Sequence, residues 1–207
     1  MNGIPLAYLA LGDSYTIGEG VAEDGRWPVQ LARALRDEGI ELADPRIIAT
    51  TGWTTDELAA AIDAAGPLGT YDLVSLLIGV NNQYRERGVE EYRGQFEALL
   101  RRAIGLAGGR ADRVLVLSIP DWGVTPFAAA SGRDRGVIAA ELDAFNAAAR
   151  VACRAAGVAF VDITPVSRAR GHEPEMLAAD GLHPSAAMYA LWAQLALPVA
   201  RDLLTPR

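Results

Sequence analysis

The stretch LAYLALGDSY, residues 6–15, is a short apolar run that ends abruptly in a glycine, a carboxylate and two hydroxyl-bearing side chains. An uninterrupted apolar run of this length is typical of a parallel strand that is buried on both faces. Four similar runs follow along the chain, and amphipathic segments of helical periodicity separate them. This alternation predicts a doubly wound sheet of five parallel strands with helices on both sides.

Local signals place the elements. Thr54 with Glu57 forms a capping box, Gly39 and Gly157 mark helix ends, and Pro184 precedes the last helix. We expect strands at residues 6–11, 41–49 (interrupted by Asp44-Pro45), 73–78, 113–119 and 158–162. We expect helices at residues 27–38, 55–65, 89–106, 136–156 and 185–204. Because no repeat, linker or low-complexity tract divides the 207 residues, we expect a single domain over residues 1–207.

The composition narrows the possible partners. A net charge of −7, from 19 basic and 26 acidic residues, weighs against nucleic acid or an anionic membrane surface. No apolar stretch approaches the roughly 20 residues that span a bilayer, and the first residues lack the basic region of a signal peptide. We expect a cytoplasmic protein with a small-molecule substrate and no stable membrane insertion. Its single cysteine, Cys153, is predicted to be a buried structural thiol.

Polar and glycine residues follow the first four predicted strands. Ser14 follows the first strand, Gly52 the second, Gly79-Val80-Asn81 the third and Pro120-Asp121-Trp122 the fourth. The carboxyl ends of parallel strands meet at one edge of the sheet, where ligands bind in doubly wound folds. The sequence therefore predicts one site that draws on all four loops.

A second motif, Asp180-Gly181-Leu182-His183-Pro184, lies just before the last predicted helix. The spacing lets one loop present both the carboxylate of Asp180 and the imidazole of His183. A serine hydroxyl attacks an ester only when a base takes its proton and a carboxylate orients that base. Ser14, His183 and Asp180 are the candidates for these roles. The structural alternatives are a serine in a turn, a helix-capping aspartate and an incidental surface histidine, which the same residues would also fit.

The motifs together resemble those of the SGNH hydrolases, the esterases and lipases also called GDSL, over residues 9–184. The resemblance implies a three-layer α/β/α, flavodoxin-like fold and a serine esterase that needs no metal or cofactor. It implies that Ser14 is the nucleophile, that His183 is the base and that Asp180 orients His183. It also implies an oxyanion hole formed by the N–H groups of Ser14 and Gly52 and the side chain of Asn81.

Four further residues fall outside these roles. Tyr15 and Asn82 stand where the family commonly has leucine and aspartate, and the second change leaves open how the loop carrying Asn81 is anchored. Asp13 is predicted to be a structural turn residue. The other histidine, His172, is predicted to be a solvated loop residue, and no metal-ligand spacing joins the two histidines.

Substrate choice is expected to depend on large side chains beside the motifs. Residues 121–136 read as a long loop, which could form an acyl pocket or a lid. A substrate contact and a packing role are equally consistent with the sequence, and Arg85 could also meet an anionic group. The candidate substrate-binding residues are Trp53, Tyr84, Arg85, Trp122 and Phe127.

Several related functions remain open at this stage. A lysophospholipase, a thioesterase and a carbohydrate deacetylase would use the same residues. From another class, the chain could be a catalytically inert flavodoxin-like binding module, but neither a Walker motif nor G-x-G-x-x-G occurs. The absence of a Gly-x-Ser-x-Gly elbow argues against an α/β-hydrolase of the other kind.

Overall fold

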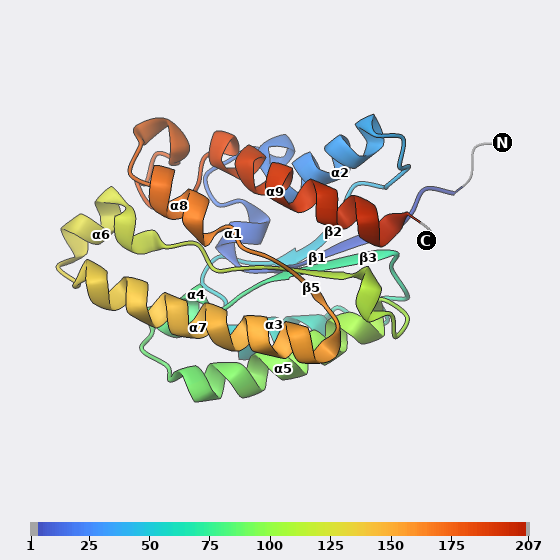
Figure 1. The fold of residues 1–207 in the computed structure, drawn as a ribbon, viewed down its shortest axis with the longest axis horizontal. Helices are drawn as coiled ribbons and strands as arrows, with labels where there is room; N and C mark the ends of the chain where they lie inside the picture. The colour runs from blue at the N-terminus through green and yellow to red at the C-terminus, as the bar shows by residue number, and fades with distance from the viewer. Residues whose placement is uncertain (1–3, 206–207) are drawn as a thin grey trace.

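The computed structural model describes residues 4–205 and contains a five-stranded sheet in which every strand pair is parallel (Figure 1). The strand order is β2-β1-β3-β4-β5, the flavodoxin-like order, in which the direction of winding reverses between β1 and β3. The strands are β1 (Tyr8–Gly12), β2 (Arg46–Ala49), β3 (Leu73–Leu77), β4 (Val114–Leu117) and β5 (Ala159–Val161).

Helices cover both faces of the sheet, which gives the expected three layers (Figure 1). Helices α2 and α9 pack together on one face, while α3, α5 and α7 cover the other. Their bounds are α2 (Trp27–Asp37), α3 (Thr55–Ala64), α5 (Val89–Leu106), α7 (Arg135–Ala156) and α9 (Ala186–Leu204).

Burial on both faces explains why the strands read as unbroken apolar runs. Every residue of β1, β3 and β4 is buried. The layers on either side contribute large side chains, among them Trp27, Trp192 and Phe96, that are almost fully buried. Cys153 is also buried and free, and burial raises the pKa of its thiol to about 12, as expected of a structural thiol.

The long helices begin and end within one residue of the predicted positions, and the capping box at Thr54 is present. The second strand is shorter than expected: β2 begins at Arg46, and Leu42 makes only an isolated parallel bridge with Leu6. Pro45 has no N–H to donate to a strand ladder, so regular pairing starts after it.

Short helices follow the strands at positions that were predicted to be loops. Residues 121–136 contain the 3₁₀ turn η3 and helix α6 rather than one irregular loop. Helices of one or two turns are too short to leave a periodic apolar pattern. The short helices are α1 (Ser14–Ile17), α4 (Val80–Tyr84), α6 (Pro126–Ser131) and α8 (Thr164–Arg170), with 3₁₀ turns η1 (Glu23–Gly25), η2 (Ala111–Arg113), η3 (Trp122–Val124) and η4 (Pro174–Met176). Within residues 4–205, no helix is both long and apolar enough to cross a bilayer.

Candidate active site

Ser14 is the first residue of α1, and only Asp13 separates it from the end of β1. The residue at the end of β1 has no room for a side chain, because a Cβ at Gly12 would lie 2.5 Å from the carbonyl oxygen of Leu77 on β3 and 2.7 Å from Cβ of Thr16 on α1. Asp13 caps the helix by accepting the backbone N–H of Tyr15 at 3.0 Å. The N–H of Ser14 stands at the first helical position, where no intrahelical acceptor exists. This N–H can therefore donate to a ligand beside the Ser14 hydroxyl.

Asp13 has the structural role predicted for it, and its environment is unusual. Its side chain is fully buried, and Oδ2 has no hydrogen-bond partner among residues 4–205. Burial raises the pKa of Asp13 to about 7, although backbone N–H groups at Tyr15 and Gly79 act in the opposite direction. The residue before Ser14 is thus a carboxyl group that titrates near neutral pH.

Asp180 and His183 form a hydrogen-bonded pair on the loop before α9. His183 Nδ1 lies 2.5 Å from Asp180 Oδ2, while Asp180 Oδ1 accepts the backbone N–H groups of Leu182 and His183 at 2.9 Å each. Partial burial acts to raise the pKa of Asp180, but these hydrogen bonds outweigh it and leave the pKa below its usual value. The carboxylate therefore stays charged and fixes both the ring and the backbone of His183.

Gly52 and Asn81 come from neighbouring segments after β2 and β3. Gly52 has φ of +88°, a left-handed conformation that favours glycine. Asn81, in α4, donates one amide hydrogen to the carbonyl oxygen of Trp53 at 2.9 Å. A side-chain amide carries two hydrogens, so the second can donate to a ligand.

Two further side chains, Asn82 and Arg85, anchor the loop that carries Asn81. They bond it to the segment after β2 and to the start of α3. Asn82 is fully buried and bonds both the backbone N–H and the hydroxyl of Thr55, at 3.1 and 2.7 Å. Arg85 donates to the carbonyl oxygen of Gly52 at 2.7 Å and pairs with Glu57 at 3.2 Å. The loop carrying Asn81 is therefore anchored without a charged residue at position 82.

A cavity of about 220 Å³ brings the predicted catalytic side chains together. Ser14, Gly52, Asn81 and His183 all line it, and Asp180 lies behind His183. Residues far apart in the chain thus meet at the carboxyl edge of β1, β2 and β3. The full lining is Ser14, Tyr15, Thr51, Gly52, Val80, Asn81, Tyr84, Trp122, Phe127, Leu182 and His183.

The candidate substrate-binding residues separate into two groups. Tyr84, Trp122 and Phe127 line the cavity, whereas Trp53 and Arg85 do not. Trp53 packs partly buried against the core, and the Arg85 guanidinium is bonded to Gly52 and Glu57. These contacts give Trp53 and Arg85 structural roles instead of a place on the cavity wall.

Sequence reasoning also missed lining residues, namely Tyr15, Thr51, Val80 and Leu182. Val80 and Leu182 lie inside the motifs, and Tyr15 and Thr51 adjoin motif residues; this position beside predicted site residues was the only available signal. Tyr15, in place of the usual leucine, meets the His183 ring edge-on with centroids 6.0 Å apart. His172 is exposed and absent from the lining, as predicted for a solvated histidine.

Three aromatic rings form one wall of the cavity. The Trp122 ring lies edge-on to Tyr84 and Phe127, at centroid distances of 5.4 and 6.1 Å. Trp122 is almost fully buried, and its indole N–H donates to Gln83 at 2.9 Å. Trp122 therefore has both of the roles that the sequence left open, since it lines the cavity and packs in the protein.

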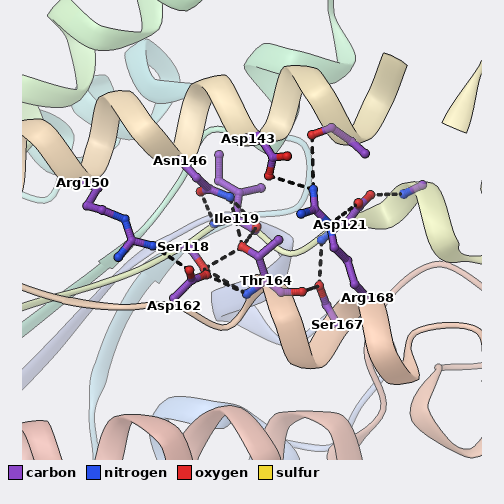
Figure 2. A network of polar contacts seen from close by, with 12 residues as sticks. Ser118, Ile119, Asp121, Asp143, Asn146, Arg150, Asp162, Thr164, Ser167 and Arg168 are labelled. Carbon is purple, nitrogen blue, oxygen red and sulfur yellow. Dashed lines mark hydrogen bonds and ion pairs between the residues drawn. The ribbon is translucent and has the colours of Figure 1, made fainter. Parts of the chain in front are cut away.

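A buried polar network supports the segment that leads into Trp122, as Figure 2 shows. Asn146 bonds both the N–H and the carbonyl of Ile119, at 2.8 and 3.0 Å, and the Thr164 hydroxyl donates to the same carbonyl at 2.9 Å. Asp121 accepts from Arg168 at 2.8 Å. The network holds the backbone on the N-terminal side of the aromatic wall.

Within the described part of the chain, no three His, Cys, Asp or Glu side chains gather as a metal site.

Solved structures share this fold over nearly the whole chain. TesA is 21% identical to this chain with a TM-score of 0.71, and the match covers 96% of this chain and 99% of TesA. A lipase/acylhydrolase from Enterococcus faecalis is 19% identical with a TM-score of 0.71, covering 98% of each chain. Axe2, an acetylxylan esterase from Geobacillus stearothermophilus, is 18% identical with a TM-score of 0.71, covering 98% of this chain and 97% of its own. At such identities the likeness demonstrates the fold.

Sequence comparison identifies the family. No protein of curated function matches the chain. The GDSL-like Lipase/Acylhydrolase family matches residues 10–191, which include both the Gly-Asp-Ser motif and the Asp180-His183 pair. The chain therefore belongs to the GDSL-like lipase/acylhydrolase family of hydrolases, as its motifs and its α/β/α fold indicated.

Proposed function

We propose that the protein is a serine esterase that hydrolyses carboxylic esters through Ser14, His183 and Asp180. The observation that carries the proposal is that Ser14 and the Asp180-bonded His183 line the same cavity. An inert binding module would have no need of an intact nucleophile, base and orienting carboxylate on two distant segments of the chain.

The reaction proceeds in two halves. The Ser14 oxygen attacks the ester carbonyl carbon while His183 Nε2 takes the hydroxyl proton, and the same nitrogen then protonates the leaving alcohol. Water repeats the sequence on the acyl-enzyme and releases the acid. Asp180, bonded to Nδ1, keeps Nε2 free to accept a proton and stabilises the charged ring.

Charge that develops on the carbonyl oxygen needs donors that are already in place. The N–H groups of Ser14 and Gly52 and the free amide hydrogen of Asn81 supply them in this proposal. The contacts that join α4 to the segment after β2 fix Asn81 and Gly52 relative to each other before substrate arrives. Preorganised donors stabilise the tetrahedral intermediate more than the ground state.

The cavity favours an ester with an apolar acyl group over an acetylated carbohydrate. Apart from Ser14, Asn81 and His183, which the reaction uses, most of its lining is aromatic or aliphatic: Tyr15, Val80, Tyr84, Trp122, Phe127 and Leu182. The wall formed by Tyr84, Trp122 and Phe127 offers ring faces and edges to a substrate. A thioester of the same acid would meet the same groups, so the two leaving groups are compared in the experiment.

A fluorophosphonate probe and a series of p-nitrophenyl esters test the proposal. We expect the probe to label wild type and not Ser14→Ala, and ester hydrolysis to disappear in both Ser14→Ala and His183→Ala. His172→Ala is the matched histidine control and should hydrolyse at the wild-type rate. Acyl-CoA thioesters of the same acids measure the leaving-group preference. Labelling that persists in Ser14→Ala would place the nucleophile elsewhere, and a wild type inert toward every ester and thioester would refute the function.

A further inference from the structure

Arg133 lies behind the aromatic wall of the cavity, in the connection between α6 and α7. Its guanidinium carbon is 5.5 Å from the centroid of Tyr84 and 5.4 Å from that of Trp122. A cation at this distance from an aromatic face is attracted to the ring quadrupole. One side chain therefore contacts two of the three rings that form the wall.

Directional contacts hold the Arg133 side chain in this position. Nη1 donates to the carbonyl oxygen of Tyr84 at 3.1 Å, and Nη2 lies 3.7 Å from the carboxylate of Glu141. Glu141 also accepts from Gln83 at 2.6 Å, and Gln83 accepts the indole N–H of Trp122. The contacts close a ring of four side chains, so Glu141 orients Trp122 through Gln83 and through Arg133.

Helix α6, which precedes Arg133, joins the aromatic wall to the loop that carries His183. Helix α6 is bound at its start, where the N–H of Phe127 donates to the carbonyl oxygen of Gly181 at 3.2 Å. At its other end, Arg133 binds the Tyr84 carbonyl. Helix α6 thus connects the Asp180-His183 loop to α4, with Phe127 facing the cavity in between.

Arg133 itself stays outside the cavity. It lines, with Gln83 and Glu141, a separate open groove of about 580 Å³. The three side chains therefore form a partition whose other side is the aromatic wall. Because Arg133 does not line the cavity, it acts on a substrate only through Tyr84 and Trp122.

We propose that Arg133 is a positioning residue that sets acyl-chain selectivity by holding Tyr84 and Trp122 as the wall of an acyl pocket. The inference rests on the proposed esterase function and adds its substrate class, esters of short to medium-length apolar carboxylic acids. A cavity of about 220 Å³ is smaller than the roughly 300–1,000 Å³ of sites for drug-sized ligands, which excludes a long acyl chain lying wholly inside it. A wall fixed in advance binds the acyl chain without a further ordering cost.

Arg133→Ala tests this role by separating binding from chemistry. We expect the KM for p-nitrophenyl hexanoate to rise by about three- to tenfold, the loss expected from two cation–π contacts, with kcat nearly unchanged. The KM for the acetate should rise less, because two carbons contact little of the wall. Arg133→Lys keeps a cation near the rings and should restore part of the hexanoate preference.

The matched control is Arg150→Ala. Arg150, on α7, likewise has its guanidinium over an aromatic ring, 4.6 Å from the Phe160 centroid, and it does not line the cavity. We expect its ratio of hexanoate to acetate kcat/KM to match wild type. If Arg133→Ala is folded and keeps the wild-type ratio, or if Arg150→Ala lowers it equally, the role of Arg133 is refuted.

A binding experiment decides the inference independently of turnover. Calorimetric titration of ethyl hexanoate into Ser14→Ala and into Ser14→Ala/Arg133→Ala should show about three- to tenfold weaker binding by the double variant. Equal affinities would overturn the inference even if the esterase proposal held. A weaker double variant would support it even if wild type hydrolysed none of the esters tested, so the two failures are distinguishable.

Discussion

The side chain of Asn82 makes two hydrogen bonds to Thr55, accepting from the backbone N–H at 3.1 Å and donating to the hydroxyl oxygen at 2.7 Å. The Thr55 hydroxyl then donates its own proton to Gln95. A carboxylate at position 82 could accept from Thr55 but could not donate to it. The amide therefore suits this buried site, and through it α4 and α3 hold the segments that carry Asn81 and Gly52.

Asn82→Ala should weaken both the fold and the reaction. It leaves the buried N–H of Thr55 without an acceptor, which costs about 1–3 kcal/mol in the free energy of unfolding. We also expect a lower kcat, since Asn81 is the adjacent residue on α4. Urea denaturation and p-nitrophenyl ester kinetics measure the two effects, and Asn82→Asp, which keeps the acceptor, should lose less stability. An unchanged urea midpoint in Asn82→Ala would contradict this account.

Asn81→Ala should lower kcat by about 10²–10³-fold, the usual cost of losing one oxyanion donor. The KM should change little, because the lost hydrogen bond forms mainly as charge develops on the carbonyl oxygen. Steady-state kinetics with p-nitrophenyl acetate provide the measurement. A variant with normal kcat and raised KM would assign Asn81 to ground-state binding instead.

Asp180→Asn should lower kcat by about 10⁴-fold while the protein stays folded. The amide oxygen can still accept the backbone N–H groups of Leu182 and His183, so the loop keeps its shape. The amide nitrogen, however, would donate to His183 Nδ1 and leave the proton on Nε2, the nitrogen that must act as base. Thermal unfolding should confirm the intact fold, and a kcat within tenfold of wild type would show that another group orients His183.

Asp13→Asn should remove a pH dependence of stability. Between about pH 4 and about pH 7, folded Asp13 is protonated whereas the unfolded residue, with an ordinary pKa of 3.8, is ionised. The folded state then binds more protons, so this group's contribution to stability falls as pH rises through that window and levels off above it. The difference approaches about 4 kcal/mol, from about three pKa units at 1.36 kcal/mol each.

Urea denaturation at about pH 5 and about pH 8 tests the Asp13 prediction. The stability of Asp13→Asn relative to wild type should increase between the two values, because the asparagine keeps the Oδ1 acceptor for Tyr15 and never ionises. A constant difference across this range would mean that Asp13 titrates near its ordinary pKa in the folded protein.

Gly79→Ala and Gly94→Ala should change stability in opposite directions. At Gly79, φ is +132° and an added Cβ would lie 2.5 Å from the Tyr92 ring and 2.9 Å from Ile119. Strain and overpacking should together cost about 2–5 kcal/mol. Gly94 lies within α5 with nothing near its added Cβ, so alanine there should stabilise by about 0.5–1 kcal/mol. Chemical denaturation of both variants checks the pair.

The sequence alone determined the sheet and the edge that carries the site. Its strands are buried on both faces, so their apolar runs are continuous and identifiable without a structure. Because parallel strands end at one edge, the positions of Ser14, Gly52 and Asn81 after three strands were enough to place them there. Asp180 and His183 are only three residues apart, so their pairing was also predictable.

The tertiary structure decided which side chains face the cavity. Arg85 donates to the Gly52 carbonyl instead of lining the cavity, whereas Tyr15 and Leu182 line it, which only their position beside motif residues had indicated. Arg133 lies behind Tyr84 and Trp122 because three separate segments pack together there, namely α4, η3 and the connection between α6 and α7. Periodicity records whether a residue is buried within its own element, but a cavity wall depends on how distant elements pack, and only the folded chain specifies that.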